Sequence, residues 1–231
     1  MNRKAFILAG LLLVGPLSAG AAQVAQRGAT PQGATNGAAT VRRDDWQRVP
    51  DILAALGATT GSRIADLGAG EGWLTTRLAR HVGPSGRVFA SDISESALRN
   101  LSQTLSRDTL RNVELVLAED DDPRLPYGTL DGVVILNAYH EMPRRVPVLE
   151  GVKRALKPGG TLVIVDNIPA DSTWRTRAEQ TSHHALSIDL ARDDLEAQGF
   201  EIVSSTPQFV EQKSGTMVHR QWMLVARRPA K

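Results

Sequence analysis

Residues 64–72 read Ile-Ala-Asp-Leu-Gly-Ala-Gly-Glu-Gly, an apolar strand that runs into a glycine-rich turn. Gly68, Gly70 and Gly72 occupy alternate positions, and Asp92 ends a second apolar segment downstream. Glycine is needed where φ is positive or where the backbone must lie close to a ligand. A glycine turn followed by a lone carboxylate is typical of Rossmann-like sheets that hold an adenosine, so the pattern favours a nucleoside cofactor.

The spacing of the glycines separates the candidate cofactors. The dinucleotide fingerprint reads Gly-x-Gly-x-x-Gly, whereas this chain has Gly-x-Gly-x-Gly followed by Trp73, which disfavours a nicotinamide oxidoreductase. Asp66 ends the first strand and places a negative charge beside the turn. Such a charge repels phosphate and attracts ammonium or sulfonium groups. S-adenosylmethionine carries both cations and no phosphate, so the residues favour it as the cofactor.

Strand and helix patterns alternate along most of the chain, which predicts a doubly wound α/β fold. Segments 132–137 and 160–166 are continuously apolar, as expected for parallel strands buried on both faces. The last two strands have no room for a crossover helix between them, so we expect them to pair antiparallel. The expected helices are 49–56, 72–82, 95–106, 143–156 and 187–198, and the expected strands are 63–67, 87–92, 112–118, 132–137, 160–166, 200–205 and 219–227. The prediction is therefore a Rossmann-like, mostly parallel, seven-stranded sheet with a C-terminal antiparallel hairpin.

Over about residues 44–228 the chain resembles the class I S-adenosylmethionine-dependent methyltransferases. Four segments carry the likeness in the family's order, namely 66–72, 88–94, 130–141 and 156–166. Residues 83–88 also resemble the quinone-biosynthesis methyltransferases, while 44–47 and 139–141 are closer to a group of exported bacterial methyltransferase-like proteins. The resemblance implies transfer of a methyl group from S-adenosylmethionine to a small acceptor.

Cofactor-binding residues are expected where the strands end, because ligands of open α/β sheets lie beyond the carboxyl ends of the strands. Asp92 can accept two hydrogen bonds from ribose hydroxyls, and its alternative role is to cap the helix that starts near Glu95. The resemblance implies an acid against the adenine amino group, and two ways of counting select Glu119 or Asp121. Asn137 ends the fourth strand. The full set is Asp66, Gly68, Gly70, Gly72, Asp92, Glu119, Asp121 and Asn137.

The triplet Tyr139-His140-Glu141 leaves the fourth strand toward the methyl group in the resembling fold. Histidine is the natural proton acceptor near neutral pH, so His140 is the candidate general base. Glu141 is expected to orient it or to act as a base, and Tyr139 to form a pocket wall. The alternative is that His140 only packs and bonds to the backbone.

Three further features leave alternatives open. His183 and His184 either line the acceptor pocket or belong to a loop that leads into the next helix. Trp46 either folds over the cofactor or fixes an N-terminal helix to the core. His81 and His140 lack the spacing of metal ligands, so no metal site is expected.

The N-terminus has the pattern of a secretory signal peptide. Arg3 and Lys4 precede an apolar run at 5–17 and small residues at 18–22, which predicts cleavage after Ala21 or Ala22. An uncleaved membrane anchor is the alternative. The expected organisation is a signal peptide at 1–22, a flexible linker at 23–40 and a methyltransferase domain at 41–231, with the mature protein periplasmic or secreted and without a stable membrane span.

Composition excludes several function classes. Removal of the signal peptide deletes two cations, so the formal net charge falls from +2 to 0. The sequence has no cluster of basic and aromatic residues, and nucleic acid is therefore an unlikely substrate. The chain has no cysteine, which excludes disulfides, a thiol nucleophile and cysteine-ligated zinc. Because the cofactor is made in the cytoplasm, the main rival to an enzyme is a non-catalytic exported protein that binds S-adenosylmethionine.

Overall fold

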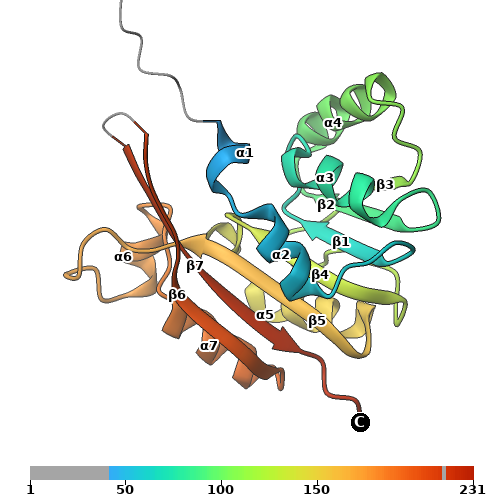
Figure 1. Ribbon diagram of the computed structural model, residues 1–231. Helices are drawn as coiled ribbons and strands as arrows, with labels where there is room; N and C mark the ends of the chain where they lie inside the picture. Colours follow the sequence, from blue (N-terminus) through green and yellow to red (C-terminus); the bar gives the residue numbers. More distant parts are fainter. Residues whose placement is uncertain (1–41, 215–216) are drawn as a thin grey trace, which may run out of the picture. The chain divides into compact units, whose positions relative to one another are not determined.

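Seven strands form one sheet in the order β3-β2-β1-β4-β5-β7-β6. The computed structural model describes residues 42–214 and 217–231, and Figure 1 shows the sheet between two sets of helices. The predicted signal peptide at 1–22 and linker at 23–40 lie outside the described residues. The strands are β1 (Arg63–Leu67), β2 (Arg87–Asp92), β3 (Val113–Leu117), β4 (Leu130–Leu136), β5 (Leu156–Asn167), β6 (Glu201–Ser214) and β7 (Met217–Arg227).

The directions of the strands confirm the predicted fold class. Strands β1 to β5 pair in parallel, and β7 is antiparallel to both β5 and β6. The fold is therefore a doubly wound, mostly parallel sheet that ends in an antiparallel hairpin. This places the carboxyl ends of the five parallel strands at one edge.

The helices are α1 (Arg43–Trp46), α2 (Val49–Leu56), α3 (Trp73–Val82), α4 (Glu95–Arg107), α5 (Arg145–Ala155), α6 (Arg177–Thr181) and α7 (Ile188–Ala197), with a 3-10 turn, η1, at Tyr139–Glu141. Helices α1 and α2 precede β1, and the other helices lie between successive strands. The sequence predicted the longer helices and missed the short α1, α6 and η1. None of the helices in residues 42–214 and 217–231 is both long and apolar enough to cross a lipid bilayer.

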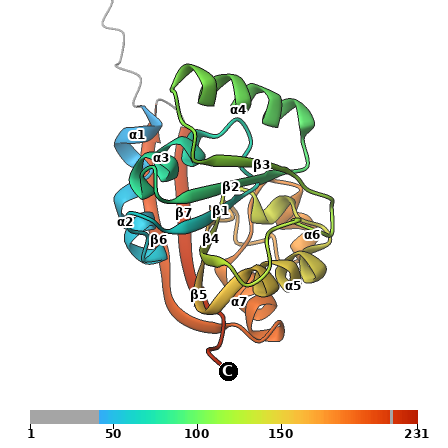
Figure 2. The same cartoon turned by 90° about the vertical axis from the view of Figure 1, so that its right-hand side faces the viewer.

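Both faces of the sheet are buried along its central strands β1, β4 and β5, as the continuous apolar runs predicted. Along β4, Val133 and Ile135 pack with residues of α5 and α7, while Val134 and Leu136 pack with residues of α2 and α3. This alternation follows from the two-residue period of a strand. Figure 2 shows α5 and α7 on the opposite side of the sheet from α2 and α3.

Strand β6 is longer than predicted, because the expected strand ended at 205 and the observed one continues to Ser214. Pro207 lies between Thr206, which pairs with Met223, and Val210, which pairs with Gln221, so the pairing shifts register there. A proline has no N–H to donate, and such an irregular position tolerates it. The strand therefore passes through the proline instead of stopping before it.

The glycine turn after β1 is tied to the end of β2. The N–H of Gly68 donates to the carbonyl of Ser91 at 2.8 Å, and the N–H of Gly70 donates to Asp92 Oδ2 at 2.7 Å. Both glycines have positive φ, +76° at Gly68 and +53° at Gly70. A Cβ atom at position 68 would lie 2.5 Å from the Cβ of Ala138, whereas one at position 70 would meet open space.

These two glycines form a matched test of the turn. Gly68→Ala combines a left-handed backbone with an overlap against Ala138, so we expect it to lower the free energy of unfolding by about 2 to 4 kcal/mol. Gly70→Ala has only the backbone cost, about 1 to 2 kcal/mol. Urea unfolding of both variants measures the difference, and equal destabilisation would show that Ala138 does not constrain the turn.

Candidate functional site

The carboxyl edge of the parallel strands carries three neighbouring cavities. Cavity A has a volume of about 280 Å³, and its walls include Gly68, Asp92, Ile93, Glu119, Asp120, Asn137, Ala138 and the segment 141–143. Cavity B, about 340 Å³, is lined by Arg43, Asp66, residues 68–71, Trp73 and Asn137 among others. Cavity C, about 530 Å³, is lined by residues 140–143, Arg145, Arg177, Ala178, Thr181 and His184. Gly68 and Asn137 contribute to both A and B, and segment 141–143 contributes to both A and C.

Asp92 lies at the end of β2 on the wall of cavity A. Its Oδ2 accepts from the N–H of Gly70 at 2.7 Å, and its Oδ1 accepts from the N–H of Ser94 at 2.8 Å. Ser94 is the N-cap of α4, because its side chain accepts from the N–H of Ala97 at 3.3 Å. Each carboxylate oxygen has a second lone pair, so Asp92 can orient the loop and still accept from a ligand in cavity A.

Asp66 is buried beneath the glycine turn and beside cavity B. The hydroxyl of Thr75 donates to its Oδ2 at 2.6 Å. Burial raises the pKa of Asp66 to about 6, although the bond from Thr75 and the charge of Arg43 oppose that rise. A cation that entered cavity B would therefore favour ionisation of this carboxyl.

Arg43 is a cavity residue that the sequence analysis missed. Its guanidinium lies 4.1 Å from the centre of the Trp73 ring, and Arg77 lies over the same ring at 4.0 Å. Burial lowers the pKa of Arg43. The sequence offered no signal beyond a basic residue just before the segment that resembles the family, because only the packing of α1 against α3 brings Arg43 to the glycine turn.

In the acidic loop after β3, two of the acids line cavity A and the others do not. Glu119 and Asp120 line the cavity, and Glu119 also pairs with Arg124. Asp121, the other sequence candidate, instead pairs with Arg144 at 2.9 Å. The geometry therefore brings Glu119 to the cavity and adds Asp120, which the sequence analysis did not select.

Asn137 lies where cavities A and B meet, and it has the left-handed φ of +58°. Its N–H donates to the carbonyl of Val165 at 2.7 Å, and its Oδ1 accepts from Gln221 Nε2 at 3.4 Å. Gln221 in turn accepts from Gln47 Nε2 at 2.6 Å. Gln47 and Gln221 are buried while Asn137 is exposed, and this amide network holds the segment after α1 to β7 and to the end of β4. Non-glycine residues with positive φ are uncommon and cluster at functional sites.

Trp46 stacks on His219 of β7, with ring centres 4.5 Å apart and planes 17° apart. It also packs against the core cluster that contains Ile52 and Leu56. Of the two roles considered for Trp46, this contact supports the one that fixes the N-terminal helix to the core.

His140 is held rigidly by the buried carboxylate of Asp166. Its N–H donates to Asp166 Oδ2 at 2.8 Å, and its ring Nδ1 lies 2.7 Å from Asp166 Oδ1. Burial lowers the pKa of His140, but the bond to Asp166 and the charges of Asp166 and Glu141 outweigh burial and raise the pKa overall. The carboxylate of Asp166 accepts a hydrogen bond from Nδ1–H. The other ring nitrogen, Nε2, lies 3.3 Å from Glu141 Oε1.

Glu141 links the two histidines that the sequence separated. Its Oε1 lies 2.8 Å from His184 Nδ1, and this bond lowers the pKa of Glu141. The rings of His140 and His184 meet edge to face at 84°, with centres 5.8 Å apart. His183 instead stacks on Trp174 at 4.0 Å. Of the two neighbouring histidines, His184 therefore belongs to cavity C.

Tyr139 does not have the position that the sequence predicted. It is buried in the hydrophobic core instead of forming a pocket wall, and its hydroxyl donates to Asp194 Oδ2 at 2.9 Å. Burial and the neighbouring Asp194 raise its pKa. The 3-10 turn of η1 directs Tyr139 inward while His140 and Glu141 line cavity C. Tyr139 therefore anchors the turn to the hydrophobic core.

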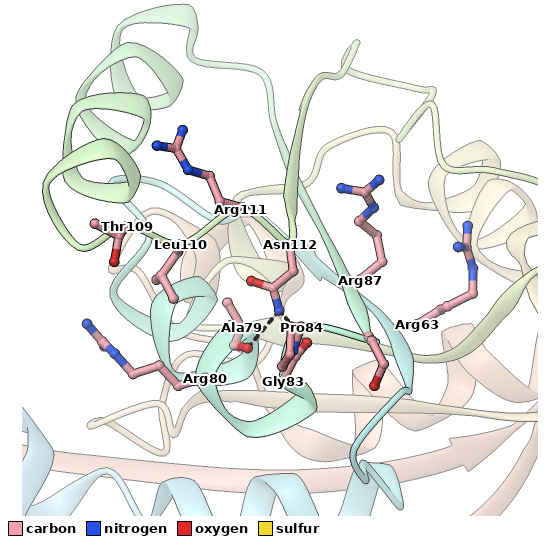
Figure 3. A pocket seen from close by; sticks show the side chains of 12 residues that line it. Arg63, Ala79, Arg80, Gly83, Pro84, Arg87, Thr109, Leu110, Arg111 and Asn112 are labelled. Atoms are coloured by element: carbon pink, nitrogen blue, oxygen red, sulfur yellow. Dashed lines mark hydrogen bonds between the residues drawn. The ribbon is translucent and has the colours of Figure 1, made fainter.

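A larger cavity of about 690 Å³ lies at the opposite edge, where β1, β2 and β3 begin. Figure 3 shows its arginine side chains, which do not converge on one point. At its centre the amide of Asn112 donates to the carbonyls of Ala79 and Gly83, both at 2.8 Å. Because that polar group already bonds to backbone, and because ligands of such sheets bind at the carboxyl edge, the candidate site is the set of cavities A, B and C.

The chain is similar to known methyltransferases in sequence and in fold. Residues 64–160 match a family of proteins described as a methyltransferase domain. The ubiquinone/menaquinone biosynthesis C-methyltransferase UbiE of Pseudomonas entomophila is 31% identical over 122 residues, which are 52% of this chain and 47% of that protein. The chain thus spans about half the length of the curated relatives that it matches.

Solved structures share the fold across a larger part of the chain. An S-adenosylmethionine-dependent methyltransferase from Aquifex aeolicus superposes with a TM-score of 0.65 at 23% identity, over 78% of this chain and 89% of that one. The [4+2]-cyclase SpnF superposes with a TM-score of 0.70 at 14% identity, over 86% of each chain. A cyclase on this fold illustrates that the reaction has to be argued from the site.

The matched segment contains the glycine turn after β1, Asp92 at the end of β2, and Asn137 and His140, which follow β4. Residues 64–160 therefore match a methyltransferase domain, and the chain is similar in sequence to quinone-biosynthesis methyltransferases and in fold to S-adenosylmethionine-dependent methyltransferases.

Proposed function

We propose that this protein binds S-adenosylmethionine across cavities A and B and transfers its methyl group to a small molecule in cavity C. The observation that carries the proposal is the wall shared by cavities A and C, residues 141–143. This wall brings a cofactor-sized groove next to a separate cavity for an acceptor. A protein that only held the cofactor would not need the second cavity, which favours an enzyme over a binding protein.

Cavity A fits the adenosine. Asp92 offers lone pairs to the ribose hydroxyls, and Glu119 and Asp120 offer acceptors to the adenine amino group. Ile93 is 62% exposed on the same wall and provides an apolar surface for the purine face. A large aliphatic side chain left open to solvent at a cavity wall is consistent with a ligand that covers it.

Cavity B fits the amino-acid end of the cofactor. Asp66 is an acid of this cavity that can pair with a bound ammonium, and Arg43 is a cation that can pair with a carboxylate. The backbone of residues 68–71 lines the same cavity, where the glycines allow close approach. The opposite charges of Asp66 and Arg43 thus match the two charges of an amino acid.

Catalysis at this site consists mainly of positioning. When bound, S-adenosylmethionine supplies a methyl group on a positively charged sulfur, a good leaving group. Asp92, Asn137 and the glycine turn hold one reactant, and the walls of cavity C align the other. His140 Nε2 can accept the acceptor's proton, because Asp166 fixes the tautomer with its proton on Nδ1.

The similarity to these relatives does not identify the methyl acceptor of this protein. The named relatives are C-methyltransferases of ubiquinone and menaquinone biosynthesis. The segment that matches the family ends at residue 160, whereas Arg177, Thr181 and His184 of cavity C come later in the chain. One part of the wall of cavity C therefore lies outside the matched segment, so the match does not identify the acceptor.

We also propose that residues 1–22 are a signal peptide and that the mature protein is periplasmic or secreted. The support is the sequence pattern of Arg3 and Lys4, an apolar run and small residues.

The first prediction concerns Asp92. Asp92→Asn keeps the size of the side chain but removes its charge, and charge-assisted hydrogen bonds contribute about 1.5 to 3 kcal/mol. We expect the dissociation constant for S-adenosylmethionine to rise by about 10-fold to 100-fold, with a parallel loss of S-adenosylhomocysteine formation in acceptor screens. Calorimetric titration measures binding. Glu95→Gln, at the exposed start of α4, is the control, and D92N binding at the wild-type level would reject the proposed cofactor site.

The second prediction concerns Asp66, which gives folding and cofactor binding opposite pH dependences. Its pKa is raised from 3.8 to about 6, so its contribution to stability is present below about pH 4 and is lost as the pH rises through about 6. A cofactor ammonium favours the ionised carboxylate, so affinity rises over the same interval, by at most about tenfold per pH unit below 6.

Asp66→Asn removes the titrating group while its amide oxygen can still accept from Thr75. We expect the variant to lose the pH dependence of stability and the pH dependence of cofactor affinity that Asp66 causes in the wild type. Thermal unfolding and S-adenosylmethionine titrations between about pH 5 and about pH 7 measure them. The same change of affinity with pH in both proteins would rule out the ammonium position.

The third prediction concerns export. The full chain produced in a Gram-negative host is expected in the periplasmic fraction, with a mature N-terminus at Ala22 or Gln23. N-terminal sequencing and intact mass measure the cleavage. A variant without residues 2–22 should stay in the cytoplasm. Full-length protein retained in the membrane would support the anchor instead.

A further inference from the structure

We propose that His140, Glu141 and His184 form a binding site for a divalent transition-metal ion on the wall of cavity C. One ligand atom from each side chain lies within 4.8 Å of the others. The inference goes beyond the proposed methyl transfer and does not depend on it. A bound ion would occupy the Nε2 lone pair of His140, so His140 can act as the proton acceptor only in the metal-free protein. The inference also revises the sequence expectation of no metal, which considered only the spacing of residues along the chain.

The distances suit a metal that replaces protons between the side chains. Nitrogen and oxygen ligands bind Zn²⁺ at about 2.0 to 2.2 Å, which keeps neighbouring ligand atoms roughly 3 to 4 Å apart. His140 Nε2 and Glu141 Oε1 are 3.3 Å apart. His184 Nδ1 and Glu141 Oε1 are closer, at 2.8 Å, as a hydrogen bond requires. The side chains of Glu141 and His184 are 58% and 74% exposed, so both can turn to admit an ion.

Two adjacent residues at the end of β5 orient both histidines. Asp166 holds Nδ1 of His140 at 2.7 Å, and Asn167 Nδ2 donates to the carbonyl of His184 at 2.9 Å. Metal-binding histidines usually donate their second ring N–H to a carboxylate or carbonyl, which fixes the ring and its tautomer. Asp166 plays that part for His140, and it leaves Nε2 with its lone pair toward Glu141.

The backbone of His184 has an unusual conformation that keeps its side chain beside Glu141. Its φ is +53°, a left-handed value that is uncommon for a residue other than glycine. Its N–H donates to the carbonyl of Thr181 at 3.1 Å, at the end of α6. The loop therefore keeps its strained residue on the wall of cavity C, facing Glu141.

Charge and ligand type favour a dication such as Zn²⁺, Mn²⁺, Fe²⁺ or Co²⁺. Two imidazoles and one carboxylate are ligands of these metals, and three protein ligands leave coordination positions for water or substrate. Glu141 directly, and Asp166 through His140, balance the two positive charges. The arginines of cavity C do not compete for Glu141, because Arg145 and Arg177 both bind Asp194, at 3.0 and 2.6 Å. All three ligand residues line cavity C, so an acceptor with an oxygen donor would reach the open positions.

Titration of the full chain, without a polyhistidine tag, with Co²⁺ tests the site. We expect one equivalent to bind with the visible absorption of a nitrogen- and oxygen-ligated Co²⁺, and Zn²⁺ to displace it. His184→Ala and Glu141→Gln should each weaken Co²⁺ binding by at least about tenfold. His183→Ala is the matched control, because His183 is the adjacent histidine but stacks on Trp174, and its affinity should equal that of the wild type.

The variants at exposed positions keep the result interpretable, and their thermal unfolding confirms that they fold. Absence of saturable Co²⁺ binding in the wild type, or equal affinity in H184A, E141Q and H183A, would overturn the site. D92N separates this inference from the proposed function, because it should lose S-adenosylmethionine binding and keep Co²⁺ binding. If the wild type binds Co²⁺ but no S-adenosylmethionine, the proposed function fails and the metal site stands.

Discussion

The parallel register of β1 with β2 and β4 is the constraint on which the whole site depends. Asp66 of β1 lies beside Ala90 of β2 and Val134 of β4, so the three strands reach the same edge together. Because parallel strands end on the same side, the loops that follow them lie next to one another at one edge of the sheet. The glycine turn, Asp92 and Asn137 meet there for this reason, and cavities A, B and C all open at this edge.

Carboxylates that accept backbone N–H groups make this edge rigid. Asp92 binds the N–H of Gly70 and Ser94, and Asp166 binds the N–H and ring of His140. Asp166 is buried and Asp92 is half-buried. A carboxylate withdrawn from water is costly unless it is hydrogen-bonded, so each of these acids stabilises one loop geometry over others. A reaction that depends on alignment needs this kind of support. The bonds of Asp166 also hold the His140 ring, one ligand of the proposed metal site, in place.

Local pattern was sufficient for much of the site. The strand ends, the glycine turn and Asp92 follow from residues within a few positions of one another, and the structure has them where the pattern predicted. The walls of the cavities were harder to predict. Arg43 reaches cavity B only through the packing of α1 against α3, and Asp120 rather than Asp121 faces cavity A because of the path of one loop. Tyr139 was predicted as a wall and is in the core, because the direction of a side chain on a single 3-10 turn has no periodic signature.

Residues close together in the chain were sufficient to predict the sheet, the order of its strands and longer helices, and the chemistry of the first two loops, because apolar periodicity and glycine spacing are local properties of the chain. Which distant side chains meet depends on the packing of the folded protein. Glu141 and His184 are 43 residues apart, and Gln47 and Gln221 are 174 apart. Such contacts depend on how loops and helices pack against the finished sheet, and no spacing rule along the chain encodes that packing.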